Sequence, residues 1–287
     1  MKKIIALLLA VLMTVAVFAG CGGNGNAGSS SNSDKTDSSS SEQKADANSD
    51  WGFIQNKGKM TIGITLFEPM NYKDDKGELT GFETEFSKAV CEELGVEADF
   101  QVINWETKEV ELKSKKIDCI WNGFTINENR QKEMDFSTPY MENRQVMVCK
   151  KDNVDKYTQS VKDTKVIAEK ESAGEEVAQS DEFFKEAKYT AADSQAKALM
   201  EVKAGTSDVA IIDFVMSKGT IREDSDYSDL AVIETKTFAP EQYGIGFRKD
   251  SSETVKKVNE VISKLKKEGK LDEIAKKYNL QDLLIVK

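Results

Sequence analysis

The sequence predicts an α/β protein that folds into two lobes. From Trp51 onward, short apolar runs typical of buried strands alternate with amphipathic helical patterns, and this alternation passes through two successive series. Strands that alternate with helices indicate a mostly parallel sheet covered by helices. Each series holds about 90 residues, which is the size of a small domain. We therefore expect two α/β lobes rather than one continuous sheet.

The first series is expected to contain three strands and two helices. Apolar residues at helical spacing favour the first helix, and Gly95 directly after them is typical of a helix end. We expect the strands at 60–67, 98–103 and 117–121, and the helices at 81–94 and 106–115.

The second series has the same character and ends in helices. We expect strands at 145–150, 165–169, 209–212, 231–235 and 243–248, and helices at 172–186 and 194–204. The C-terminal part predicts one amphipathic helix, an interruption at Gly269 and a last helix. The apolar faces of these two helices consist of Val255, Val258, Val261, Ile262 and Leu265, and of Leu271, Ile274 and Tyr278.

The N-terminal fifty residues differ from the rest. Lys2 and Lys3 precede an apolar run over 4–17, which is the pattern of a signal peptide, predicted at 1–20. The run is shorter than the roughly 20 residues that a membrane-spanning helix needs. Residues 21–50 are rich in Ser, Gly and Asn and almost free of apolar residues, which predicts a disordered tether.

The residues Phe18-Ala19-Gly20-Cys21 resemble a bacterial lipobox, although Phe18 stands where Leu is the usual residue. This resemblance implies cleavage before Cys21 and acylation of its thiol. The protein would then be lipid-anchored on the extracytoplasmic face of the cell membrane. The alternative is an ordinary secreted protein in which Cys21 is a free thiol.

Composition excludes several classes of function. The chain has 287 residues, no histidine and a formal net charge of -10. Without histidine, His-based catalytic triads and His metal sites are excluded, and the acidic balance argues against a nucleic-acid partner. We expect Cys91, Cys119 and Cys149 to be buried small hydrophobic residues, while a disulfide between two of them stays open.

Five segments together resemble one family. GFETEF (81–86), IDCIWNGFTINENR (117–130), DFSTPY (135–140), SDVAIID (207–213) and YGIGFRK (243–249) occur in the order and spacing of the amino-acid-binding proteins of ABC importers, bacterial solute-binding proteins of family 3. The resemblance covers about residues 51–280. It implies a type II periplasmic-binding-protein-like fold with a two-strand hinge, formed by YMENR and FAPEQ. Lobe 1 would span 51–140 plus 241–287, and lobe 2 would span 145–238.

The resemblance assigns Arg130 to the carboxylate of a bound amino acid. A planar guanidinium binds a carboxylate through two parallel hydrogen bonds. The alternative is that Arg130 forms a surface ion pair with Glu128 or Glu133.

The resemblance also implies ligand contacts from both lobes. From lobe 1 they are the Gly123 carbonyl, Thr125, and the aromatic walls Phe67 and Trp105, for which core packing is the alternative. From lobe 2 they are Asp213 for the ammonium group, and Ser172 with the N–H of Ala173 for the carboxylate. The alternative for Asp213 and Ser172 is helix capping, with Glu175 completing a capping box at Ser172. Glu171 stands where the family usually has Gly.

The side chain of the ligand is less defined by the sequence. Glu68, Glu106 and Glu169 lie near the expected pocket, and a carboxylate facing the ligand side chain would favour Lys, Arg or ornithine. The alternative is that all three carboxylates point to water.

We therefore expect a receptor that binds a free, polar amino acid and delivers it to an ABC permease with its ATPase. We expect it to act as a monomer without cofactor or metal and to perform no chemistry. Two alternatives stay open. One is a dehydratase-type enzyme on the same fold, for which Glu169 is the candidate acid. The other is a ligand sensor that acts through a partner.

Overall fold

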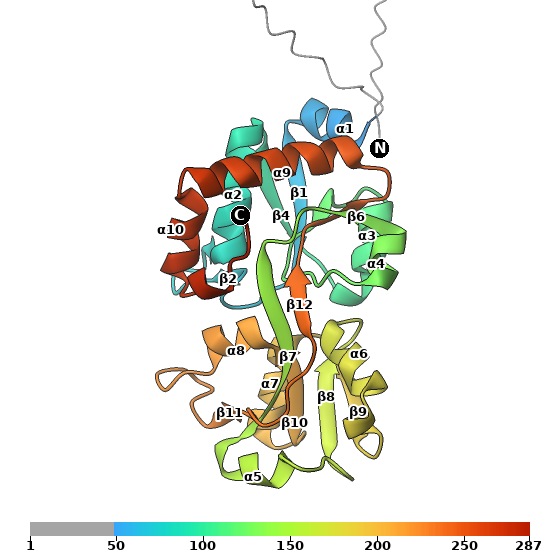
Figure 1. Ribbon diagram of the computed structural model, residues 1–287, viewed down its shortest axis with the longest axis vertical. Coiled ribbons are helices and arrows are strands. Elements are labelled where there is room, and N and C mark those ends of the chain that lie inside the picture. The colour runs from blue at the N-terminus through green and yellow to red at the C-terminus, as the bar shows by residue number, and fades with distance from the viewer. Residues whose placement is uncertain (1–48) are drawn as a thin grey trace, which may run out of the picture. The chain divides into compact units, whose positions relative to one another are not determined.

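The computed structural model describes residues 49–287. Two sheets divide these residues into two lobes that are joined by two neighbouring strands (Figure 1). We call the part built on the first sheet lobe 1 and the part built on the second sheet lobe 2. The predicted signal peptide, Cys21 and all but the last two residues of the predicted tether lie outside the described residues.

Lobe 1 is built on a five-stranded sheet in the order β4-β1-β5-β13-β6. The first three strands are parallel, and β13 runs antiparallel to both of its neighbours. Strands β2 and β3 form a separate antiparallel ribbon. The bounds are β1 Lys59–Ile64, β2 Tyr72–Lys73, β3 Leu79–Thr80, β4 Glu97–Val102, β5 Cys119–Ile120, β6 Met134–Phe136 and β13 Gly246–Arg248.

Helices from both ends of the chain cover this sheet. Phe82 and Phe86 of α2 share one hydrophobic core with Val258 and Ile262 of α9, so the C-terminal helices pack on lobe 1. The helices are α1 Asp50–Lys57, α2 Phe82–Leu94, α3 Lys108–Lys113, α4 Glu128–Glu133, α9 Ser252–Lys267 and α10 Lys270–Lys277, with short 3-10 turns η1 Trp105–Thr107 and η4 Gln281–Leu283.

The connection between the lobes is a pair of antiparallel strands (Figure 1). Strand β7 (Met141–Lys150) is continuous: its first residues pair with β12 (Pro240–Tyr243), and its later residues belong to the sheet of lobe 2. The strand predicted at 145–150 therefore begins four residues earlier. The strand predicted at 243–248 is interrupted, because β12 ends at Tyr243 and β13 begins at Gly246.

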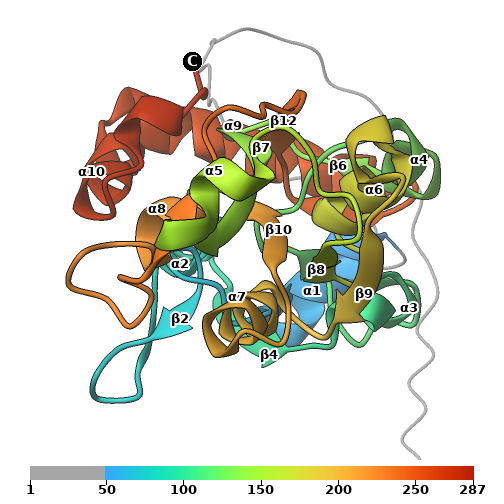
Figure 2. The same ribbon diagram turned by 90° about the horizontal axis from the view of Figure 1, so that it is seen from below.

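Lobe 2 has its sheet in the order β11-β7-β10-β8-β9, with β8, β9 and β10 parallel. Val209 and Ile211 of β10 pack into the core on the α6 side, whereas Ala210 and Ile212 share a core with α7. These two helices thus cover opposite faces, as Figure 2 shows from below. The remaining bounds are β8 Lys165–Glu169, β9 Lys188–Ala192, β10 Val209–Asp213, β11 Leu230–Val232, η2 Lys151–Asn153, α5 Val154–Tyr157, α6 Ala173–Ser180, η3 Glu182–Phe184, α7 Gln195–Ala204 and α8 Phe214–Thr220.

Several predicted elements are shorter than expected. The helix predicted at 172–186 ends at Ser180, because Asp181 is extended and its side chain caps the following 3-10 turn at Phe183. The helix predicted at 106–115 is a 3-10 turn followed by α3. The strand predicted at 60–67 ends at Ile64, where its pairing with β4 also ends. Strand β9 and helix α1 were not predicted.

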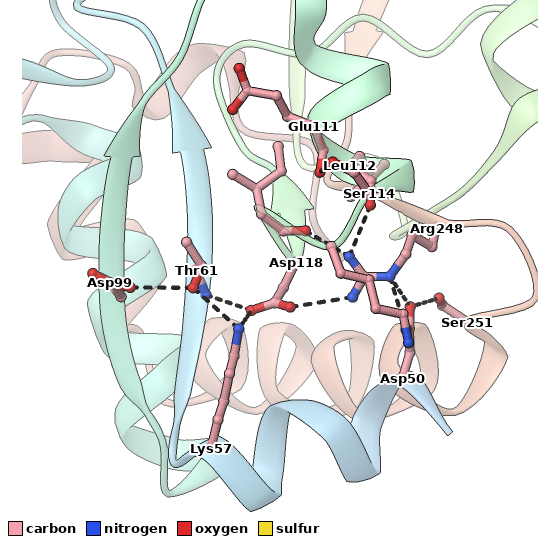
Figure 3. A network of polar contacts seen from close by, with 12 residues as sticks. Asp50, Lys57, Thr61, Asp99, Glu111, Leu112, Ser114, Asp118, Arg248 and Ser251 are labelled. Atoms are coloured by element: carbon pink, nitrogen blue, oxygen red, sulfur yellow. Dashed lines mark hydrogen bonds and ion pairs between the residues drawn. The ribbon is translucent and has the colours of Figure 1, made fainter. Parts of the chain in front are cut away.

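A buried network of charges fastens α1 to the sheet of lobe 1 (Figure 3). Asp118, which is fully buried, accepts hydrogen bonds from the Thr61 N–H at 2.7 Å, from Arg248 at 3.3 Å and from Lys57. Arg248 also forms an ion pair with Asp50 at 2.8 Å. Asp50, which we placed at the end of the tether, therefore belongs to the folded lobe.

The three cysteines that follow the N-terminal segment are free thiols. Cys91, Cys119 and Cys149 are all buried, as the sequence indicated, and no disulfide joins them. Burial raises the pKa of the Cys91 thiol to about 12 and that of Cys149 to about 11. These groups act as small core residues.

Candidate ligand-binding site

A small cavity lies where the two lobes face each other, beyond the carboxyl ends of β5, β8 and β10. In parallel sheets, ligands bind at these strand ends. The cavity measures about 10 Å³, which is room for about one water molecule, so that a larger ligand requires the lobes to move apart. Its lining comes from both lobes: Trp105, Asn122, Gly123, Thr125 and Arg130 from lobe 1, and Glu169, Ser172, Ala173, Gln195 and Asp213 from lobe 2.

Arg130 is a buried cation, 8% exposed, in the first turn of α4. Its backbone N–H donates to the N-cap side chain of Asn127 at 2.9 Å, and Nη1 donates to the Thr125 carbonyl at 2.7 Å. Within residues 49–287 it forms no ion pair, and Glu133, the partner in the alternative reading, pairs with Lys113 instead. Burial lowers the pKa of Arg130. The guanidinium therefore retains donors for an anion.

Gly123 brings main chain to the cavity. Its φ of 54° lies in the left-handed region that favours glycine, and a Cβ atom here would meet Cε1 of Phe67 at 2.5 Å. Its N–H donates to the buried Glu83 carboxylate at 2.8 Å, which fixes the loop. Phe67 thus packs against Gly123 and does not line the cavity, in contrast to the other seven predicted contact residues.

Asp213 is the buried acid of lobe 2, at the end of β10. Its carboxylate accepts hydrogen bonds from Asn143 at 2.6 Å, from Gln145 at 2.7 Å and from Gln195. Although Asp213 precedes α8, its side chain makes no capping bond, so the capping alternative is wrong. No ion pair involves Asp213 among the described side chains, and burial raises its pKa.

Ser172 and Ala173 begin α6 and point its N-terminus toward the cavity. The Ser172 hydroxyl accepts from the Glu175 N–H at 3.1 Å, which confirms the predicted cap. The reciprocal bond differs from the predicted box, since Glu175 accepts from the N–H of Glu171 at 2.7 Å rather than of Ser172. A helix N-terminus favours an anion nearby.

Trp105 and Thr125 complete the lobe 1 side. Trp105 packs edge-on against Phe124, and its indole N–H is buried without a hydrogen-bond partner in the described part of the chain. The Thr125 hydroxyl donates to Glu241 of the connecting strand β12 at 3.1 Å. Burial, and then the nearby charge of Asp213, raise the pKa of Glu241 to about 7.

The three glutamates predicted to lie near the ligand side chain differ in their exposure and in their ionic partners. Glu106 pairs with Lys170 at 2.6 Å and Glu68 with Arg222 at 3.2 Å, and all four side chains are substantially exposed. Glu169 alone lines the cavity: it is 4% exposed, and its Oε1 has no hydrogen-bond partner among residues 49–287. Burial, and then the charge of Asp213, raise the pKa of Glu169 to about 8.

Several polar residues around the cavity were not predicted from the sequence. Asn143 and Gln145 alternate along β7, so that both reach Asp213, and each also donates to Glu241 at 3.0 Å. Polar residues two apart on an otherwise apolar strand were the available signal. Gln195 and Lys108 gave no signal, because a polar residue at the start of a helix is ordinarily solvated.

Within residues 49–287, no group of three or more acidic or cysteine side chains is arranged to hold a metal ion. No helix in that range has the length and apolar character needed to cross a bilayer.

The sequence also matches a family of known proteins. The sequence profile of the bacterial extracellular solute-binding proteins, family 3, matches residues 60–281, which is most of the chain and all of both lobes except their ends.

Individual relatives carry different ligand names. The glutamine-binding protein GlnH of an ABC transporter from Bacillus subtilis is 31% identical over 98% of this chain and 99% of its own length. The arginine-binding extracellular protein ArtP of the same organism is 29% identical over 82% of this chain and 91% of its own. Among solved structures, the ancestral amino acid-binding protein AncCDT-1, a precursor of cyclohexadienyl dehydratase, is 30% identical with a TM-score of 0.72, covering 80% of this chain and 99% of that one.

Proposed function

The chain belongs to the bacterial extracellular solute-binding proteins of family 3, and we propose that it binds a free amino acid between its lobes and delivers it to an ABC importer. Relatives named for amino acids and ABC transport support this proposal. The two-strand hinge lets the lobes part for entry and close around the ligand.

One observation carries the amino-acid proposal: two buried, opposite charges line the cavity from different lobes, and neither has an ionic partner in the described chain. A buried charge is costly unless it is paired. The α-carboxylate would bind Arg130, with the Ser172 hydroxyl and the Ala173 N–H beside it. The α-ammonium would bind Asp213, the Gly123 carbonyl and Thr125.

We further propose that the side chain of the ligand is cationic. Glu169 adds a second carboxylate to the cavity lining, and its Oε1 lacks a donor among residues 49–287. Arginine, lysine or ornithine would supply that donor and favour the ionised form of Glu169, whereas the carboxylate of glutamate or aspartate offers no donor and would be repelled by that ionised form. The Trp105 ring would pack against the aliphatic part of such a side chain.

We also propose a cellular location for the protein. A lipid on Cys21 would hold the receptor on the extracytoplasmic face of the membrane, with residues 22–48 as a tether, as the resemblance of FAGC to a lipobox supports. We propose that it works as a monomer with its permease.

Thermal unfolding of the purified protein against the twenty amino acids, ornithine and cystine tests the function. A ligand at 100 times its Kd stabilises the folded state by about 2.7 kcal/mol. We expect an upward shift of Tm with arginine, lysine or ornithine. A shift with a neutral amino acid alone would refute the cationic assignment, and no shift with any would refute amino-acid binding.

A dehydratase is the second candidate, favoured by one observation. A buried acid whose pKa is raised to about 8, such as Glu169, is protonated at neutral pH and suits general acid catalysis. Incubation with a hydroxycyclohexadienyl carboxylate, whose hydroxyl group can leave as water, followed by chromatography of the products, distinguishes the two candidates. Turnover that Glu169→Gln abolishes would establish the enzyme, whereas we expect none.

A further inference from the structure

Lys108 is a buried cation that the proposed function does not use. It opens α3, is 3% exposed and forms no ion pair with any residue of the described chain. Its Nζ donates to two carbonyls, Trp105 at 3.2 Å and Glu171 at 3.1 Å, and lies 4.8 Å above the Trp105 ring. Burial, and then the charge of Arg130, lower the pKa of Lys108 to about 8.

The acceptor at Glu171 belongs to the other lobe. Glu171 has φ of 58°, and its N–H is held by the Glu175 side chain. This conformation directs its carbonyl to lobe 1, where it also receives Nη2 of Arg130 at 3.4 Å. The two cationic nitrogens are thus at most 6.5 Å apart, because both bond to one oxygen at 3.1 and 3.4 Å.

The other contacts between the lobes on this side are exposed. Lys170 and Glu106 form an ion pair with both side chains nearly half exposed, and Asn127 donates to Glu176 at the surface. Exposed pairs of this kind contribute little to the free-energy difference between the open and closed arrangements of the lobes. The contact of Lys108 and Arg130 with the Glu171 carbonyl is less exposed, because its two donor side chains are buried, so opening and closing change its hydration more.

We propose that Lys108 is a positioning residue that makes closure of the lobes depend on the carboxylate of the ligand. Closing brings two dehydrated cations onto one neutral carbonyl. Glu169 of lobe 2 acts on Lys108 and Asp213 acts on Arg130, but in the described chain neither carboxylate forms an ion pair with these cations, so that closing without a ligand leaves both unpaired, which is unfavourable. A ligand carboxylate at Arg130 compensates the positive charges of both side chains. Lys108 does not line the cavity, so it influences the ligand only electrostatically and through its hydrogen bond to the Glu171 carbonyl. This inference rests on the proposed amino-acid site.

The first arm of the test compares L-arginine with L-argininamide, in which a neutral amide replaces the α-carboxylate. Calorimetry on the wild type and Lys108→Met should show the Kd for arginine raised about tenfold in the variant and the Kd for argininamide unchanged or lowered. Lys108→Arg should restore the preference for the acid. Lys113→Met is the matched control, because Lys113 lies on the same helix with its side chain 55% exposed.

The second arm needs no ligand. Small-angle scattering compares two full chains that both carry Cys21→Ser to prevent acylation, one with Lys108 and one with Lys108→Met. The chain with Lys108→Met should have the smaller radius of gyration, because the repulsion that opposes closure is removed. Lys108→Gln repeats both arms if the methionine variant does not fold.

The outcomes separate the two proposals. An arginine-to-argininamide preference that is the same in Lys108→Met and wild type overturns the role of Lys108, and so does an unchanged radius of gyration. A wild type that binds neither compound refutes the cationic ligand, and the scattering arm then still decides on Lys108.

Discussion

Arg130 of lobe 1 and Asp213 of lobe 2 line the same cavity as buried charges of opposite sign, and neither forms an ion pair within residues 49–287. Asp213 is held by three side-chain amides, whereas Arg130 is held by main-chain carbonyls. Each charge is therefore oriented but not neutralised. This arrangement suits a zwitterion, whose two ends would pair with both charges at once.

Arg130→Ala should abolish amino-acid binding. The guanidinium would give the ligand carboxylate two charge-assisted hydrogen bonds, whose loss costs about 3 kcal/mol or more and weakens binding at least about 100-fold. Isothermal titration measures this effect. Lys132→Ala, an exposed cation on the same helix, is the control and should bind as the wild type does. Affinity in Arg130→Ala within tenfold of the wild type would refute the carboxylate assignment.

Binding of arginine should strengthen as the pH rises. The pKa of Glu169 is raised to about 8 by burial, so the acid is mostly protonated below that pH, while a cationic side chain binds its ionised form. Binding therefore has to release a proton, and affinity should rise by up to tenfold per pH unit from about pH 6 to about pH 8 and then level off.

Glu169→Gln is the matched variant for this pH dependence. It should bind arginine more weakly, and its affinity should depend less on pH. The remaining pH dependence would come from Glu241, whose pKa is raised to about 7. Calorimetry at several pH values makes the comparison. If arginine affinity depends on pH in Glu169→Gln as steeply as in the wild type, another group is responsible for the pH dependence.

Arg248→Met should strongly destabilise the protein. Arg248 joins the buried Asp118 to Asp50, and its removal leaves these carboxylates without that cation inside lobe 1 (Figure 3). Breaking a buried ion pair on one side costs about 3–5 kcal/mol. Urea unfolding should show this loss, while the neighbouring exposed Lys249→Met should change stability by less than about 1 kcal/mol. Equal unfolding midpoints for the two variants would contradict the structural role of the network.

Cys21→Ser should release the protein from the membrane. If an acyl chain on this thiol is the anchor, the variant has no buried hydrocarbon to hold it and should leave the membrane fraction on cell fractionation. Ser29→Ala, a change within the same segment, should leave the distribution as it is. Retention of Cys21→Ser with the membranes would show that another feature holds the protein there.

The α/β alternation, the family and most of the residues that line the cavity can be predicted from the amino-acid sequence. Strand periodicity and helix ends are local properties, and a few well-spaced motifs identify a fold because the same residues recur at the same strand ends. Arg130, Gly123, Thr125 and Asp213 could be found in this way, since each follows a strand or begins a helix at a recognisable place.

Which polar residues share the cavity and which face water depends on how distant segments pack together. Glu68, Glu106 and Glu169 are alike in sequence, yet two of them pair with exposed cations and one is buried beside Asp213. Likewise, Lys108 reads as a solvated helix residue and meets the Glu171 carbonyl only because the lobes lie against each other. Burial and charge pairing arise from contacts between distant segments, and the local pattern of a chain does not contain them.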